Sequence, residues 1–346
     1  MTENGRTESD ALIPAAPHGL AVLASVNPLV SRGIDDLSKR DLLQGKLRVA
    51  PDRAAAKRYY EKARCSLYNI WGELNLETCL SASFSNINEA IQLDPMFPYA
   101  YCLRAEMRMT LRQFDSALED FGLAIRLEPA NPNLFRARGR ALLELKDYEN
   151  AIADYDEFVR GDGSSLAIEE RGEACLAAGY FDKAVSDFEK VIAYYGSEDS
   201  CWRAIAYCNR AIARFNKGGR GEALEDFKAA AADFEAARLQ YNPDDDEAAE
   251  AWLLATCPLE EIRNGQRAVD LARAEANGRP SQVIAAAYAE SGRFDDAVRE
   301  METLGEPRVS LHQRAMRDEV EQYRWRLQLY RRGKPYRENA GPFEVP

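Results

Sequence analysis

Three successive stretches share one pattern and decide the fold: PYAYCLRAEMRMTLRQFDSALEDFGLAIRLEP (98–129), PNLFRARGRALLELKDYENAIADYDEFVRGDG (132–163) and SLAIEERGEACLAAGYFDKAVSDFEKVIAYYG (165–196). Each contains an alanine shortly after a polar turn, at Ala117, Ala151 and Ala184. Ala117 and Ala151 are 34 residues apart, and Ala151 and Ala184 are 33 apart. A period of this length predicts a stack of similar helix pairs.

Side-chain spacing within each stretch indicates how the paired helices pack. The second half places an alanine, an aromatic and an apolar residue at i, i+4 and i+7, as in Ala151, Tyr155 and Phe158. This spacing puts all three on one face of a helix. The first half has a small residue such as Gly139, which lets the second helix approach closely. One pair cannot bury its own apolar face, so neighbouring pairs must stack. The sequence therefore predicts an all-α solenoid of helical hairpins.

These stretches resemble the tetratricopeptide repeat (TPR) family. The resemblance is specific in residues 98–131, 132–164 and 165–198, and it extends to 204–240. Two features depart from the family pattern. Ile168 replaces the first-helix aromatic of the third repeat, and the fourth repeat has GGRG (218–221) in its turn. The resemblance implies a TPR array over 98–241.

The rest of the chain is divided by comparison with this array. Residues 51–97 look like a degenerate helical pair that caps it. Residues 245–338 resemble the C-terminal module of many bacterial TPR proteins, through AWLLATCP (251–258), AAAYAESG (285–292) and LYRRGKPYRE (329–338). Residues 1–50, which are polar at the start and interrupted by proline, are expected to be disordered or extended. Residues 339–346 form a tail.

The charge and the cysteine content of the chain limit the classes of binding partner and the cellular compartments that we expect. The chain has 346 residues and a formal net charge of −12, which disfavours nucleic acid and anionic membranes as general partners. No stretch approaches the roughly 20 apolar residues that cross a bilayer. The seven cysteines include no CxxC pair, and this usage is typical of a reducing compartment. We therefore expect a cytoplasmic protein.

Motifs for chemistry are missing from the sequence. The two histidines, His18 and His312, are far apart in the chain, and neither lies in a metal-binding or nucleophile motif. The Gly-Lys pairs at 45–46 and 333–334 lack the Ser or Thr of a phosphate-binding loop. We therefore predict no enzymatic activity, no cofactor and no metal.

The TPR resemblance implies that one face of each first helix lines a peptide-binding groove. In that register the second, fifth, ninth and twelfth positions point inward. The candidate residues are Tyr99, Glu106, Met109, Asn133, Arg136, Arg140, Leu143, Glu169, Glu173, Leu176, Ile205, Ile212 and Phe215. The fourth repeat supplies apolar side chains, which suit an amphipathic helix or an extended peptide. Cys102, Glu106, Ala137 and Leu166 stand where chaperone-binding TPR domains have a Lys/Asn carboxylate clamp, so chaperone tails are not expected as ligands.

Two interpretations remain open for Arg136 and Arg140, which lie at i and i+4 on one helix face. Their guanidinium groups would suit a carboxylate or phosphorylated peptide. Alternatively, they pair with Glu106, Glu169 or Glu173 on neighbouring first helices, in a network of small net energy.

The basic segment 324–337 suggests a second candidate function besides peptide binding. It contains six cations and no acid, together with Trp325, Tyr330 and Tyr336. Such a segment suits a nucleic acid, in which case the chain is an accessory or regulatory subunit. It also suits a terminal helix docked on an acidic body. The main prediction is a non-enzymatic scaffold that binds a peptide or helix of a partner protein. The sequence does not identify the partner, the biological pathway or the oligomeric state.

Overall fold

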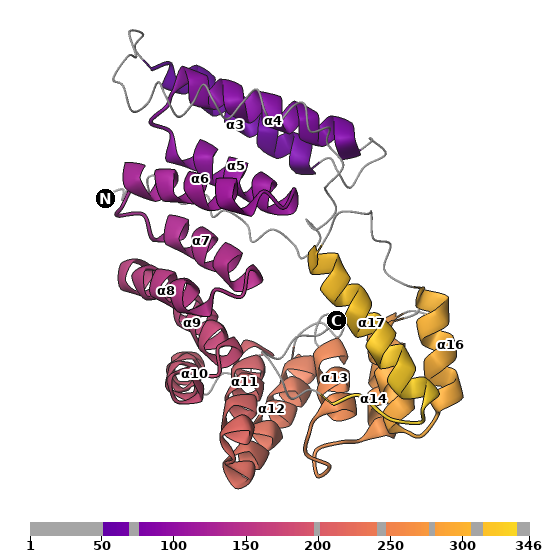
Figure 1. Ribbon diagram of the computed structural model, residues 1–346. Helices are drawn as coiled ribbons and strands as arrows, with labels where there is room; N and C mark the ends of the chain where they lie inside the picture. Colours follow the sequence, from indigo (N-terminus) through magenta and orange to yellow (C-terminus); the bar gives the residue numbers. More distant parts are fainter. Residues whose placement is uncertain are drawn as a thin grey trace, which may run out of the picture. The chain divides into compact units, whose positions relative to one another are not determined.

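The computed structural model describes residues 51–68, 76–196, 201–240, 247–276, 281–305 and 314–337. All regular secondary structure in these ranges is α-helix, which confirms the predicted all-α class (Figure 1). The predictions for residues 1–50 and 339–346, and both histidines, lie outside the described residues.

The chain divides into two compact units. One comprises residues 1–117 with 309–316, and the other comprises 118–308 with 317–346. The division falls within α6 (Phe114–Leu127). The helices of the first unit are α3 (Arg53–Tyr68), α4 (Leu76–Leu93) and α5 (Pro98–Thr110).

The second unit holds the hairpins on which the candidate site depends. Its helices are α7 (Pro132–Glu144), α8 (Tyr148–Asp162), α9 (Ser165–Ala177), α10 (Phe181–Tyr195), α11 (Cys201–Lys217), α12 (Arg220–Gln240), α13 (Glu247–Thr256), α14 (Gly265–Ala276), α15 (Gln282–Glu290), α16 (Phe294–Leu304) and α17 (Arg314–Arg331), the last from residue 317 on. Helices α7 to α12 pack as three hairpins that follow one another, as the solenoid prediction requires (Figure 1).

Helix ends in this unit follow from local sequence. The side chain of Asn131 accepts a hydrogen bond from the backbone N–H of Asn133 at 3.1 Å, and the Ser164 hydroxyl accepts one from the N–H of Ala167 at 3.2 Å. Both residues cap first helices by satisfying N–H groups that have no partner within the helix. In the turns between the helices of a hairpin, Lys146 and Gly179 have positive φ. Glycine is the favoured residue at such a position because it has no Cβ.

The expected packing inside each hairpin is present. Ala151, Ala184 and Ala223 are fully buried on the second helices. A Cβ added at Gly172 would lie only 3.1 Å from the Phe188 ring, which is tighter than ordinary contact. The small residue in the first helix therefore does allow the close approach that the sequence pattern predicted.

The core of the terminal module, which we define as α13 to α17, is continuous with the core of the central hairpins. Trp252 on α13 is fully buried, and its ring centroid lies 5.6 Å from that of Tyr336. The guanidinium carbon of Arg326, on α17, lies 5.0 Å from the Trp252 ring and 4.7 Å from the Tyr336 ring. Residues that follow α17 therefore pack back on α13.

Candidate functional site

One side of each first helix in the second unit is occupied by ion pairs. Arg138, Arg171 and Arg210 bind the carboxylates of Asp154, Asp187 and Asp226, respectively, with shortest N···O distances of 2.7, 2.7 and 2.6 Å. Each arginine reaches the aspartate 16 residues further on, in the second helix of the same hairpin. We call these three pairs the arginine–aspartate ladder.

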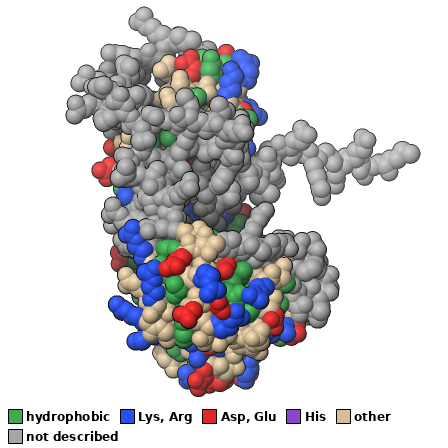
Figure 2. Space-filling view, turned by 90° about the vertical axis from the view of Figure 1, so that its right-hand side faces the viewer, with side chains coloured by type: hydrophobic (Ala, Val, Ile, Leu, Met, Phe, Trp, Pro, Cys, Tyr) green, Lys and Arg blue, Asp and Glu red, His purple; other side chains and the backbone are tan. Residues whose placement is uncertain are grey.

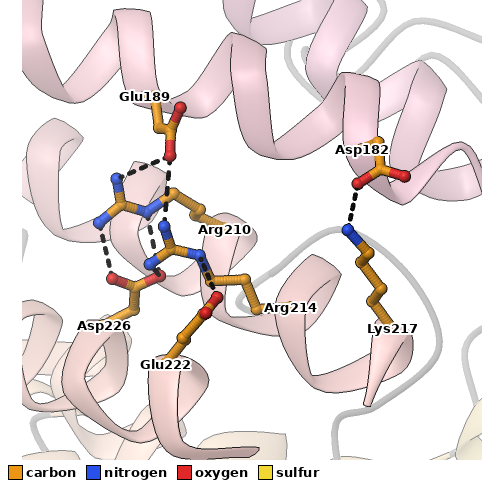
Figure 3. Close-up of polar contacts among 7 residues, drawn as sticks. All are labelled: Asp182, Glu189, Arg210, Arg214, Lys217, Glu222 and Asp226. Atoms are coloured by element: carbon orange, nitrogen blue, oxygen red, sulfur yellow. Dashed lines mark hydrogen bonds and ion pairs between the residues drawn. The ribbon is translucent and has the colours of Figure 1, made fainter. Parts of the chain in front are cut away.

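Members of this ladder also contact the preceding hairpin. Arg171 on α9 makes a second ion pair with Asp156 on α8, at 2.8 Å. Arg214 on α11 pairs with Asp226 on α12 at 2.7 Å and with Glu189 on α10 at 3.2 Å (Figure 3). These ion pairs thus hold α9 and α11 each between two second helices and fix which side of each helix faces away from them.

Sequence reasoning missed this ladder although its signal is in the chain. Each arginine directly precedes the small residue of the first helix, as in Arg138–Gly139 and Arg171–Gly172. Each aspartate directly precedes the aromatic residue of the second helix, as in Asp187–Phe188. A repeated opposite-charge pair at a fixed separation would have predicted the contact.

The opposite side of α7, α9 and α11, which we call the first-helix face, carries the predicted groove residues of the second unit. An ion pair joins α7 to α9 across this face, and α9 contacts α11. The residues differ widely in exposure. Asn133 and Arg140 are exposed; Arg136, Leu143, Glu173, Ile205 and Phe215 are half-buried; Glu169, Leu176 and Ile212 are buried. Leu176 and Ile212 therefore belong to the core and present almost no surface.

Three predicted groove residues lie in the other unit. Tyr99, Glu106 and Met109 are on α5, where Tyr99 is half-buried, Glu106 is exposed and Met109 is buried. They are described with that unit and are not part of the first-helix face.

Arg136 does pair with a glutamate on the next first helix, but not with one of the expected residues. Its Nε and Nη2 atoms donate to the carboxylate of Glu170, at 2.9 and 2.5 Å. This hydrogen bonding raises the pKa of Arg136. Pairing with Glu106, Glu169 or Glu173 was the wrong prediction because the expected register was offset by one residue, which is about 100° around a helix.

Arg140 has a different environment from Arg136. It is exposed, and within the described ranges it makes no ion pair or hydrogen bond. The two arginines look equivalent in sequence, but Arg136 joins two helices through an ion pair, whereas the Arg140 side chain faces solvent.

Glu169 is the most unusual titratable group of the face. Its exposed fraction is 8%, and it has no hydrogen-bond or ion-pair partner among the described residues. Desolvation, with a further contribution from the charge of Glu170, raises the pKa of Glu169 to about 7. The carboxyl group is therefore partly protonated at neutral pH.

Exposed aromatic side chains at the end of α10 and the start of α11 were not singled out by sequence reasoning. Burial raises the pKa of Tyr195, a side-chain hydrogen bond with Ser165 lowers it, and the charge of Glu169 raises it. The ring of Tyr194 packs edge-on against that of Tyr195 with centroids 5.4 Å apart. Tyr194 is 70% exposed, and Trp202, at the start of α11, is 57% exposed.

Reactive chemistry has little support in the described part of the chain. No three His, Cys, Asp or Glu residues there are grouped so that they could hold a metal ion. Burial raises the pKa of Cys175 to about 11 and that of Cys257 to about 12, so both thiols stay protonated at neutral pH. Within the same residues, no helix is both long and apolar enough to cross a membrane.

Part of the basic segment 324–337 is used inside the terminal module. Arg331 pairs with Glu302 at 2.7 Å, Arg337 pairs with Glu290 at 2.6 Å, and Arg326 donates to the side chain of Gln282 at 2.5 Å. On the described part of the side shown in Figure 2, positive and negative side chains are interspersed. These contacts are those of a docked terminal helix.

Comparison with known proteins supports the resemblance noted in the sequence. Residues 98–131 and 137–160 match the tetratricopeptide repeat family. These two segments are similar to tetratricopeptide repeats. The match covers less than half of the chain, and it does not test the bacterial C-terminal module. A comparison with curated proteins finds no match.

Solved structures show the same type of solenoid. Yeast Tom70 is 14% identical over 87% of this chain and 58% of its own length, with a TM-score of 0.54. MamA is 17% identical over 54% of this chain and 96% of its own, with a TM-score of 0.45. YrrB, described as a TPR protein with an unusual peptide-binding site, is 21% identical over 53% of this chain and 88% of its own, with a TM-score of 0.43. The likeness to Tom70 and the two matched repeats show that the fold of the chain is a TPR-like helical solenoid.

Proposed function

We propose that the chain is a non-enzymatic scaffold that binds a peptide or helix of a partner protein on the first-helix face of α7, α9 and α11. The observation that carries this proposal is that the two sides of these helices differ in their contacts. The side that faces the second helices is occupied by the arginine–aspartate ladder. The first-helix face keeps Asn133 and Arg140 exposed and leaves Ile205 and Phe215 half-buried.

Such a surface suits a protein segment better than a small molecule. It presents separate apolar and polar side chains along three successive helices, which can contact alternate positions of an extended or helical segment. Repeat solenoids use extended surfaces of this kind for recognition. The general role of TPR proteins as interaction modules agrees with the proposal.

A matched pair of substitutions tests the choice of face. Asn133→Trp places a bulky side chain on α7 at an exposed position of the first-helix face. Asn150→Trp makes the same exchange at an exposed position of α8, a second helix. Affinity capture from lysate of the source cell, followed by mass spectrometry, should lose a partner with Asn133→Trp and retain it with Asn150→Trp. Equal capture by both variants would contradict the proposal.

A further inference from the structure

Three buried groups in the terminal module can donate a hydrogen bond but have no acceptor. They are the indole Nε1 of Trp252, the guanidinium Nε of Arg326 and the phenol oxygen of Tyr330. None of these residues is more than 5% exposed, so bulk water does not replace the missing acceptors. A buried polar atom without a partner costs folding free energy and is rare in folded proteins. Three such groups in one core point to a ligand that supplies acceptors.

The three side chains belong to one cluster. Arg326 and Tyr330 are at i and i+4 on α17, so both lie on the buried side of that helix. The guanidinium carbon of Arg326 lies 5.0 Å from the ring of Trp252 on α13. The Tyr336 ring packs against both, 4.7 Å from that carbon and 5.6 Å from the Trp252 ring. We call this cluster the Arg326 site, and Tyr336 fills the space beside it.

The charge of the Arg326 site favours an anion. Arg326 donates to two glutamine side chains, at 2.5 and 3.3 Å, but within the described residues it makes no ion pair. Next to Tyr336 in the chain, Arg337 shares the carboxylate of Glu290 with Arg263, so one negative charge serves two cations. A buried charge is normally paired with one of opposite sign. The site therefore has positive charge in excess, although the chain as a whole is acidic.

The segment that covers the site is joined to α17 by a turn. Residues 334–337 have no regular secondary structure, and Gly333 before them has a φ of 66°, which glycine adopts without strain. The Tyr336 ring packs on Trp252 and, edge-on, on Trp325. Another aromatic ring can make the same contacts, so a ligand can replace the Tyr336 ring without the loss of helical structure.

We propose that the terminal module binds a small aromatic carboxylate at the Arg326 site. The ring of the ligand takes the place of the Tyr336 ring on Trp252, and its carboxylate accepts hydrogen bonds from Arg326, Trp252 and Tyr330. Hydrogen bonds to a charged group are stronger than neutral ones, which offsets the displacement of Tyr336. The donors are fully buried, so a small molecule suits the site better than a group attached to a long chain. The site is separate from the first-helix face, and its test does not depend on the proposed function.

A matched pair of small molecules tests the requirement for an anion. Benzoate and benzamide have the same ring and nearly the same shape, but only benzoate is charged at neutral pH. Titration calorimetry with the full chain should give benzoate an affinity about tenfold higher than benzamide. Tyr336→Ala removes the ring that covers the site, so it should raise the affinity for benzoate, because binding no longer has to displace that ring.

Two buried tyrosines of α17 separate a role in binding from a role in folding. Tyr330→Phe removes a hydroxyl without a partner, so it should not lower the denaturation midpoint of the free chain, but it should lower benzoate affinity about fivefold. Tyr323→Phe removes a hydroxyl that donates to the carbonyl oxygen of Met301 at 2.6 Å. This variant should lower the midpoint and leave benzoate affinity unchanged. Arg326→Gln should remove the preference for benzoate over benzamide.

Three results would overturn the inference. One is equal binding, or no binding, of benzoate and benzamide by the unmodified chain. Another is an unchanged benzoate affinity in Tyr330→Phe, which decides the question even if Arg326→Gln does not fold. The third is an equal loss of affinity in Tyr323→Phe and Tyr330→Phe, because that result would reflect stability rather than a contact with the ligand.

Discussion

The central hairpins and the terminal module are built from similar helix pairs but are held together differently. In α7 to α12, each hairpin repeats the same buried contact, an arginine that binds an aspartate 16 residues further on. The terminal module has ion pairs of its own, such as Arg263–Glu290 and Arg267–Glu250, both at 2.8 Å, but they do not repeat at a fixed separation. It adds an aromatic and cationic cluster around Trp252, Arg326 and Tyr336, which has no counterpart in the ladder.

The largest effect is expected from the centre of the terminal module. Trp252→Ala removes a fully buried ring that contacts both Arg326 and Tyr336, and it should lower the free energy of unfolding by about 4 kcal/mol. Urea denaturation followed by circular dichroism measures this loss. Trp325→Ala is the comparison: its ring also packs edge-on against Tyr336, with centroids 5.4 Å apart, but it is 50% exposed, so its removal should cost less. Similar losses in both variants would show that the cluster is not the centre of the module.

The pH dependence of the free energy of unfolding reports on Glu169. The pKa of Glu169 is raised from 4.5 to about 7 in the folded state. Between pH 4.5 and pH 7 the folded chain therefore keeps a proton on Glu169, whereas the unfolded chain has released it. The free energy of unfolding should therefore fall as pH rises from about 4.5 to about 7, by on the order of 3 kcal/mol from this group. Below pH 4.5 Glu169 is protonated in both the folded and the unfolded state, so it adds nothing to the pH dependence of the free energy of unfolding.

Glu169→Gln gives the matched comparison for that titration. The variant has no carboxyl group at this position, so it should be more stable than the unmodified chain at pH 8 and nearly equal to it at pH 4.5. Denaturation curves at these two values of pH measure the difference. A variant that is less stable at pH 8 would mean that Glu169 has a stabilising partner.

Within the array, buried ladder pairs should matter and exposed pairs should not. Asp226→Asn weakens the contacts to both Arg210 and Arg214, and it should cost about 2 kcal/mol because the aspartate side chain is only 5% exposed. The control is Lys217→Gln, which removes the nearby ion pair with Asp182 on the surface and should not change the denaturation midpoint (Figure 3). Equal effects would remove the distinction between the two kinds of pair.

A pair of glycine substitutions gives the smallest contrast between the two regions. A Cβ at Gly265 in the terminal module would lie 2.6 Å from the backbone nitrogen of Ser291, so Gly265→Ala should destabilise the chain by about 1–2 kcal/mol. Gly221, on α12 in the array, has nothing within 4 Å of an added Cβ. Gly221→Ala should therefore raise the free energy of unfolding by somewhat less than about 1 kcal/mol. Differential scanning calorimetry of both variants measures the two signs.

The periodic part of the sequence was enough to predict the fold. Alanine and aromatic positions such as Ala184 and Phe188 lie where the pattern placed them, because burial of a helix face requires that spacing. The candidate site was less accessible to sequence reasoning. The glutamate that pairs with Arg136 depends on how α7 and α9 cross. The structure pairs Arg136 with Glu170, one residue after the predicted Glu169.

Burial on the first-helix face was also only partly predictable. The register identified the right helices, but Leu176 and Ile212 are covered by neighbouring elements, and that cover depends on contacts between hairpins. The exposed rings of Tyr194 and Trp202 lie at helix ends, where a repeat pattern gives no expectation. Exposure at such positions can be read only from the folded chain.

The ladder has a consequence for how a chain like this can change in length. Each central hairpin contains both the arginine and the aspartate of its own ladder pair, so copying or deleting one whole hairpin leaves every remaining ladder pair complete. The ladder arginines and aspartates would keep each other as partners in that process, whereas Arg136 would lose Glu170 if α9 and α10 were deleted. Arg326, by contrast, depends on Trp252 in a helix much earlier in the sequence. Growth and shrinkage by duplication should thus be tolerated between α7 and α12, while the segment from α13 to α17 must be inherited whole.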